Sequence, residues 1–89
     1  MSKKLPKWFN GEHYPRGEKV SNPYNGESYF LEAAELSMYD FIKGTEHIFG
    51  VHQATQPNKP LDDQLLVDFE RGLSWFRKAN PKAYMILLD

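Results

Sequence analysis

The pattern of apolar residues changes near residue 31. Before that point, turn-forming dipeptides separate short aromatic runs, and after it apolar residues recur at helical spacing almost to the end of the chain. Strands gathered at one end and helices at the other are typical of α+β domains, whereas alternating strands and helices build parallel sheets. The sequence therefore predicts an α+β fold, with short N-terminal β-hairpins over about residues 7–31 packed on a C-terminal helical bundle.

Chain length limits how much surface this fold can bury. With 89 residues, the chain is expected to form a single domain over residues 1–89, and a domain of this size hides only about 60–65% of its unfolded surface. Aromatic residues make up 15% of the chain, and each can bury roughly 150–250 Å². We therefore expect aromatic side chains to supply much of the core, and both tryptophans to be covered by other parts of the chain.

Two turn signals predict the hairpins. Asn10-Gly11 stands between aromatic residues in the segment 8–14 and suits a type I′ turn. Residues 19–21 and 28–31 flank a second turn, in which Gly26 can adopt the left-handed conformation. Residues 1–6 are expected to be flexible.

Three helices are expected after the hairpins, over about residues 33–49, 62–79 and 81–88, with an exposed loop at 50–60. Glu32 stands near the start of the first helix, Asp62 and Asp63 begin the second, and Asn80-Pro81 ends the second and starts the third. Gly72 lies at the edge of the apolar face of the second helix, where close approach of a neighbouring backbone would compensate its poor helix propensity.

The first helix has two apolar faces. At 100° per residue, a broad stripe predicts the core side, with Leu36 and Tyr39 on the opposite side. The helix is therefore expected to form the middle layer, packed on the other helices and on the hairpins. The residues of the stripe are Ala34, Met38, Phe41, Ile42, Thr45, Ile48 and Phe49.

Catalytic and metal-binding patterns are weak. The chain contains no cysteine, and His47 and His52, with Glu46 alongside, are five residues apart where four would place both imidazoles on one helical face. Asp62 and Asp63 are interpreted as helix-capping residues. The sequence therefore predicts a non-enzymatic protein without cofactor or metal; an enzyme would instead bring His47, His52 or acidic residues together in a pocket.

Surplus apolar residues indicate a surface for protein contacts. The second face of the first helix and the apolar last helix exceed what a core of this size requires. We expect the contact partner to be an unknown protein or a second copy of the chain. The candidate interface residues are Leu36, Tyr39, Trp75, Tyr84 and Met85.

Nucleic-acid binding is the alternative interpretation. Trp75 lies off the core side of its helix between Arg71 and Lys78, and Trp8 follows Lys7 in a basic segment. An aromatic ring between bases can stack on a nucleobase while the cations hold phosphate. This alternative predicts salt-sensitive binding to single strands.

Membrane association is not expected. No run approaches the roughly 20 apolar residues that span a bilayer, and the N-terminus lacks the pattern of a signal peptide. A cytoplasmic location is the simplest interpretation.

Three stretches resemble small proteins encoded by tailed phages, notably marine T4-like phages. They are residues 22–27, residues 36–44 and the C-terminal run 75–89. The resemblance implies a setting, either the cytoplasm of an infected bacterium or the virion, and it implies no activity or functional residue.

Overall fold

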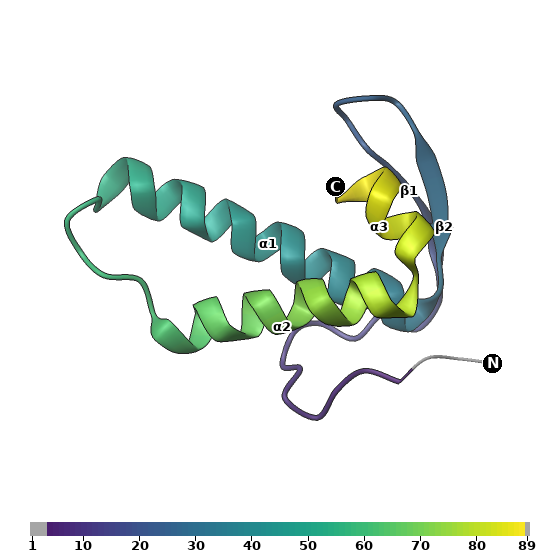
Figure 1. Ribbon diagram of the computed structural model, residues 1–89, viewed down its shortest axis with the longest axis horizontal. Helices are drawn as coiled ribbons and strands as arrows, with labels where there is room; N and C mark the ends of the chain where they lie inside the picture. Colours follow the sequence, from purple (N-terminus) through teal and green to yellow (C-terminus); the bar gives the residue numbers. More distant parts are fainter. Residues whose placement is uncertain (1–3, 89) are drawn as a thin grey trace.

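The computed structural model describes residues 4–88, which form a two-stranded sheet followed by three helices (Figure 1). The strands are β1 (Glu18–Ser21) and β2 (Ser28–Leu31), and the helices are α1 (Ala33–Thr55), α2 (Asp63–Ala79) and α3 (Pro81–Leu87). In Figure 1, α1 and α2 run antiparallel side by side, and α3 lies against the β-hairpin at one end of them. The predicted α+β class is confirmed.

The second predicted hairpin is present. β1 and β2 pair antiparallel, from Glu18 opposite Leu31 to Ser21 opposite Ser28. Gly26 takes a φ of 73° in the turn, as predicted, and this left-handed conformation is readily accessible to glycine. The buried Asn22 joins the hairpin to α3, because its side-chain amide donates to the backbone oxygen of Ile86 at 2.9 Å.

The first predicted hairpin is wrong, since residues 4–17 form no strand. Successive side chains of a strand point to opposite faces, but Trp8 and Phe9 both pack against Phe41 of α1, with ring centroids 6.0 and 5.7 Å away. Gly11 has no positive φ and instead lies under the Phe9 ring. Residues 4–17, here called the N-terminal segment, therefore form an irregular segment without a strand or helix.

The N-terminal segment contributes to the core. Phe9 is buried, and Leu5 and Trp8 pack against the core while staying partly exposed. The predicted flexibility of residues 1–6 falls partly on residues 1–3, which lie outside the described range. Leu5 and Pro6 are held by packing and by a turn in which the Phe9 amide donates to the Pro6 oxygen at 3.0 Å.

α1 starts where predicted and ends later. Glu32 and Glu35 form a capping box at its N-terminus. The predicted end at Phe49 is wrong, because Gly50 is tolerated inside the helix and α1 continues to Thr55. The helix ends before Pro57, which disfavours helical geometry at Gln56, so the predicted loop at 50–60 is reduced to residues 56–62.

α1 packs on α2 and β2, but α3 packs mainly on α2 and β2, so α1 is not the middle layer that the sequence predicted, and its faces differ from the expected ones. Residues 35–38 are all buried, because α2, β2 and the N-terminal segment surround this part of α1. Leu36 belongs to the core, and Tyr39 packs toward Phe76 of α2 with ring centroids 6.3 Å apart. Ile48, expected in the core, is 49% exposed.

α2 and α3 both begin at the predicted capping residues. Asp62 accepts from the backbone amide of Gln64 at the start of α2, and Asn80 accepts from that of Ala83 at the start of α3. Pro81 occupies the first turn of α3. The Asn80 amide also donates to the buried Glu35 carboxylate at 3.2 Å, which links the junction between α2 and α3 to the N-terminus of α1.

Gly72 lies against side chains of α1, and not against a neighbouring backbone as predicted. A Cβ atom built there would lie 3.1 Å from Met38 Sδ and 3.5 Å from Ile42 Cγ1. The branched side chain in Gly72→Val has no room, so we expect a loss of about 1–3 kcal/mol in the free energy of unfolding, measured by urea denaturation. The matched control is Gly50→Ala on the open side of α1, where no atom lies within 4 Å and we expect a gain of roughly 0.5–1 kcal/mol. Equal effects at the two positions would contradict this packing.

Candidate functional site

One side of α1 carries a row of small and apolar residues spaced alternately by four and three positions. Positions with this spacing face one side of a helix and form the contact seam of paired helices. We call this row the α1 seam. Its members are Ser37, Phe41, Gly44, Ile48, Val51 and Thr55.

The N-terminal segment covers the first two residues of the α1 seam. The Ser37 hydroxyl accepts from the backbone amide of Tyr14 at 2.9 Å and donates to the Ala33 oxygen at 2.8 Å. Phe41 is covered by the rings of Trp8 and Phe9. The α1 seam is thus already a packing surface within the chain.

The other four residues of the α1 seam, Gly44, Ile48, Val51 and Thr55, form what we call the open half of the seam. Ile48 and Val51 are 49% and 47% exposed, and a Cβ atom built on Gly44 would meet no atom within 4 Å. A shallow hollow of about 470 Å³ extends along this part of α1. Its lining residues are His47, Ile48, Val51, His52, Thr55 and Gln56.

The hollow brings the two histidines onto one surface, but without a carboxylate among its lining residues. His52 Nε2 lies 2.6 Å from the backbone oxygen of Lys59 in the following loop. Within residues 4–88, no group of three or more His, Cys, Asp or Glu side chains gathers in a way that could hold a metal ion. The arrangement is that of an apolar surface with imidazoles at its rim.

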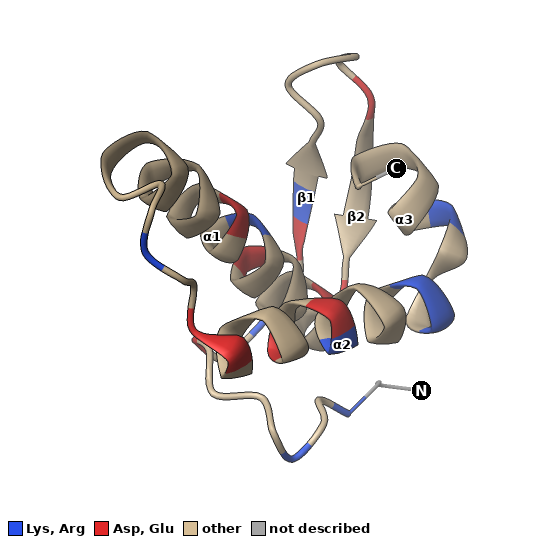
Figure 2. Cartoon of the chain, turned by 60° about the vertical axis from the view of Figure 1, so that its left-hand side comes forward, with Lys and Arg blue, Asp and Glu red and all other residues tan. Residues whose placement is uncertain are grey.

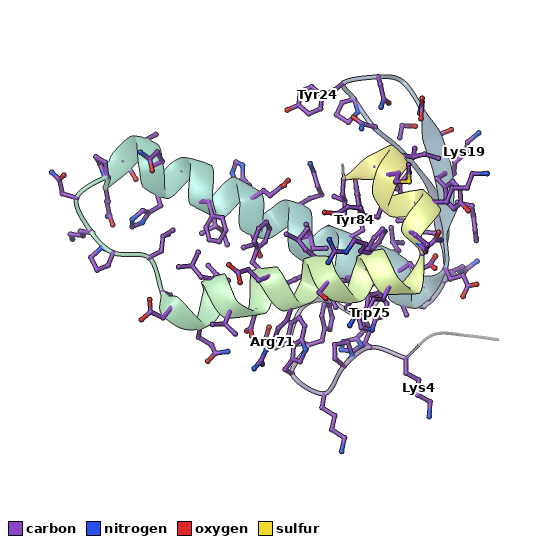
Figure 3. All side chains as sticks on the ribbon, in the orientation of Figure 1. Lys4, Lys19, Tyr24, Arg71, Trp75 and Tyr84 are labelled. Carbon is purple, nitrogen blue, oxygen red and sulfur yellow. The ribbon has the colours of Figure 1, made fainter. Side chains whose placement is uncertain are left out.

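A second surface surrounds Trp75. Lys4 of the N-terminal segment meets Trp75, Lys78 and Ala79 of α2 around a hollow of about 420 Å³, which we call the Trp75 hollow. Figure 3 shows Arg71 and Trp75 on the side of α2 that faces the N-terminal segment, and the Lys4 side chain extending from that segment away from α2. The sequence predicted the cations on α2, and the fold adds Lys4 to them.

The five residues predicted as an interface do not share one exposed surface. Leu36 is buried in the core, while Tyr39, Trp75 and Tyr84 are half-buried. The Arg77 guanidinium lies 5.9 Å from the centre of the Tyr84 ring. Only Met85, at 67% exposure, presents most of its side chain.

The residues predicted to contact nucleic acid divide in the same way. Lys7, Arg71 and Lys78 are exposed, whereas Trp75 is partly buried against the core and lines a hollow together with Lys78. The Trp8 ring, in contrast, packs edge-on against Phe41 and belongs to the covered part of the α1 seam.

Among residues 4–88, three side chains have displaced pKa values, all away from neutral pH. Burial, followed by the nearby Asp40 carboxylate, raises the pKa of Tyr14, and burial raises that of Tyr39. The pKa of Lys43 is raised mainly by its hydrogen bond to Glu46, with which it forms an ion pair at 2.9 Å. The two phenols therefore stay neutral, and the ammonium stays charged, at pH 7.

The sequence analysis missed the open half of the α1 seam. Val51 was assigned to a loop because Gly50 was interpreted as the end of the helix, and Ile48 was assigned to the core. The four-three spacing of apolar residues continues through Gly50 to Thr55, and Pro57 is the first residue that breaks the helix. These two signals could have revealed the surface.

Among residues 4–88, no helix has both the length and the apolar character that crossing a bilayer requires. Comparison of the chain with protein-family models, with curated proteins and with solved structures finds no match.

Proposed function

We propose that this chain is a non-enzymatic interaction protein that self-associates through the open half of the α1 seam. The observation that carries the proposal is the contrast along one side of α1. The chain covers the seam at Ser37 and Phe41 and leaves Ile48 and Val51 about half exposed. An apolar row that is a packing surface at one end is suited to packing at the other end as well.

A second copy is the partner that fits this row. In an antiparallel pair of α1 helices centred between residues 49 and 50, Ile48 faces Val51 of the second copy and Gly44 faces Thr55 of it. The four-three-four spacing is therefore self-complementary under a two-fold axis, which is the commonest symmetry of homo-oligomers. Gly44 permits close approach because it carries no side chain. No charged residue belongs to the open half of the seam.

The contact is small, and its size sets the expected affinity. Four residues over three helical turns bury less than the roughly 800 Å² per partner of a standard interface. We therefore expect a dissociation constant of about 1 μM or weaker. Interfaces of this size associate at high protein concentration and dissociate at low protein concentration.

The resemblance to small proteins of tailed phages supports a setting for this function. We propose that the protein acts in the cytoplasm of an infected bacterium or within the virion, where high local concentration would favour a weak self-contact.

The central prediction is that Ile48→Asp abolishes self-association. The carboxylate would face an apolar seam across the two-fold axis, where burying an unpaired charge is costly. Sedimentation velocity between about 5 and 500 μM is expected to show a concentration-dependent dimer for the native chain and a monomer for Ile48→Asp.

Met85→Asp is the matched control, because Met85 is also an exposed apolar residue but lies on α3, away from the α1 seam. It is expected to retain the dimer. A native chain that stays monomeric at 500 μM contradicts the proposal.

The orientation can be tested by cysteine pairing, since the chain has no cysteine of its own. Mixing Ile48→Cys with Val51→Cys is expected to give a mixed disulfide under mild oxidation in an antiparallel dimer. A parallel pair would instead favour disulfides between two Ile48→Cys chains.

A further inference from the structure

We propose that the Trp75 hollow binds single-stranded nucleic acid, with a base stacked on the indole and neighbouring phosphates held by Lys4, Arg71 and Lys78. This site lies on α2 and the N-terminal segment, and it is independent of the open half of the α1 seam.

The Trp75 hollow combines an aromatic side chain with lysines. Lys4 and Lys78, from distant parts of the sequence, line the hollow together with the partly buried Trp75. Arg71 adds a guanidinium one helical turn before Trp75, on the same side of α2 (Figure 3). An aromatic face bordered by cations is the combination that binds a base together with its phosphates.

Carboxylates of residues 4–88 do not neutralise Lys4, Arg71 or Lys78. Among residues 4–88, no carboxylate lies within 4 Å of the charged groups of Lys4, Arg71 or Lys78. Lys43, by comparison, is paired with Glu46. The three cations near Trp75 are therefore available for an anionic partner.

Acidic and basic residues are unevenly distributed along α2. Its first turns carry Asp63, Asp68 and Glu70, and its last two turns carry Arg77 and Lys78 (Figure 2). The net charge of −1 consequently hides a basic end of α2, to which Lys4 of the N-terminal segment is added at the Trp75 hollow. A strand lying there meets the cations of the last turns of α2, and Arg71 directly follows Glu70 at the border of the acidic part.

A single strand fits this site better than a duplex. Stacking on Trp75 needs a base whose face is free, which unpaired strands provide for every base. The hollow, at about 420 Å³, is a shallow site on the surface, so each contact is limited to one base and its adjacent phosphates.

The experiment titrates a 12-nucleotide oligothymidylate into Trp8→Phe. The chain has two tryptophans, so this variant retains Trp75 alone. The phenyl ring at position 8 preserves an aromatic contact with Phe41. We expect quenching of Trp75 fluorescence on binding. With three phosphate contacts, the affinity is expected to fall about 20-fold between 50 and 200 mM salt.

Charge reversal locates the site. In the Trp8→Phe background, Lys4→Glu with Lys78→Glu is expected to weaken binding at least about ten-fold. The matched control is Lys19→Glu with Lys59→Glu, which makes the same change in net charge on β1 and on the loop between α1 and α2, and it is expected to weaken binding less than about three-fold. Circular dichroism of both pairs establishes that the fold is intact.

Three results would overturn the proposal. They are unchanged Trp75 fluorescence at saturating oligonucleotide and low salt, an equal loss of affinity in both charge-reversal pairs, and binding of thymidine monophosphate as tight as that of the oligonucleotide. Heparin that displaces the strand without quenching Trp75 itself would support base stacking, because heparin is a polyanion without bases.

Discussion

Replacing Phe76 by alanine is expected to lower the free energy of unfolding by about 3–5 kcal/mol. The ring is completely buried near the C-terminal end of α2, where it packs toward Tyr39 of α1. Removing it deletes apolar contacts with both helices and leaves a cavity that a rigid core fills only in part. A domain of 89 residues has a total stability of roughly 4–13 kcal/mol, so the loss is a large fraction of the whole.

Urea denaturation followed by circular dichroism measures the effect. The control is Val67→Ala on the same helix, where the side chain is 42% exposed and the expected loss is below about 1 kcal/mol. If Phe76→Ala lost no more than Val67→Ala, the two-helix contact would not be the centre of the core.

The local signals in the sequence were read correctly. Helix starts at Glu32, Asp62 and Asn80 follow from side chains that satisfy backbone amides a few residues away, so the necessary information lies within one turn of sequence. Gly26 likewise carries the signal for its turn. Such features need no knowledge of the tertiary structure.

The errors arise where distant segments decide the outcome. Asn10-Gly11 is a strong hairpin signal, but Trp8 and Phe9 gain more by packing together on Phe41 than by alternating across a strand. Leu36 resembles a surface residue on a helical wheel and is buried because three other elements meet there.

The candidate sites show the same division. The cations beside Trp75 could be predicted from helical spacing, whereas Lys4 joins them only because the N-terminal segment crosses back over α2. Which half of the α1 seam stays open depends on where that segment ends its contact, near Phe41. The helical period predicts that α1 carries a seam, but it does not predict which part of the seam another segment covers.

Asn80→Ala is expected to lower the free energy of unfolding by about 2–4 kcal/mol. The side chain performs two functions at the junction of α2 and α3. Its oxygen caps α3 through the Ala83 amide, a contribution of about 1 kcal/mol. Its amide donates to the Glu35 carboxylate, which is 1% exposed, and removing a donor from a buried charged group costs about 1–3 kcal/mol.

Two further variants separate these functions. Asn80→Ser keeps a capping oxygen but does not reach Glu35, so thermal or urea unfolding is expected to show a loss of about 1–2 kcal/mol. Asn80→Asp keeps the cap as well, yet it directs a second carboxylate at Glu35, which already accepts the backbone amide of Glu32 at 2.9 Å. Like charges in a buried site repel, so Asn80→Asp is expected to be less stable than Asn80→Ser at pH 7. The opposite order would contradict repulsion between position 80 and Glu35, because aspartate and serine are about equally good N-caps.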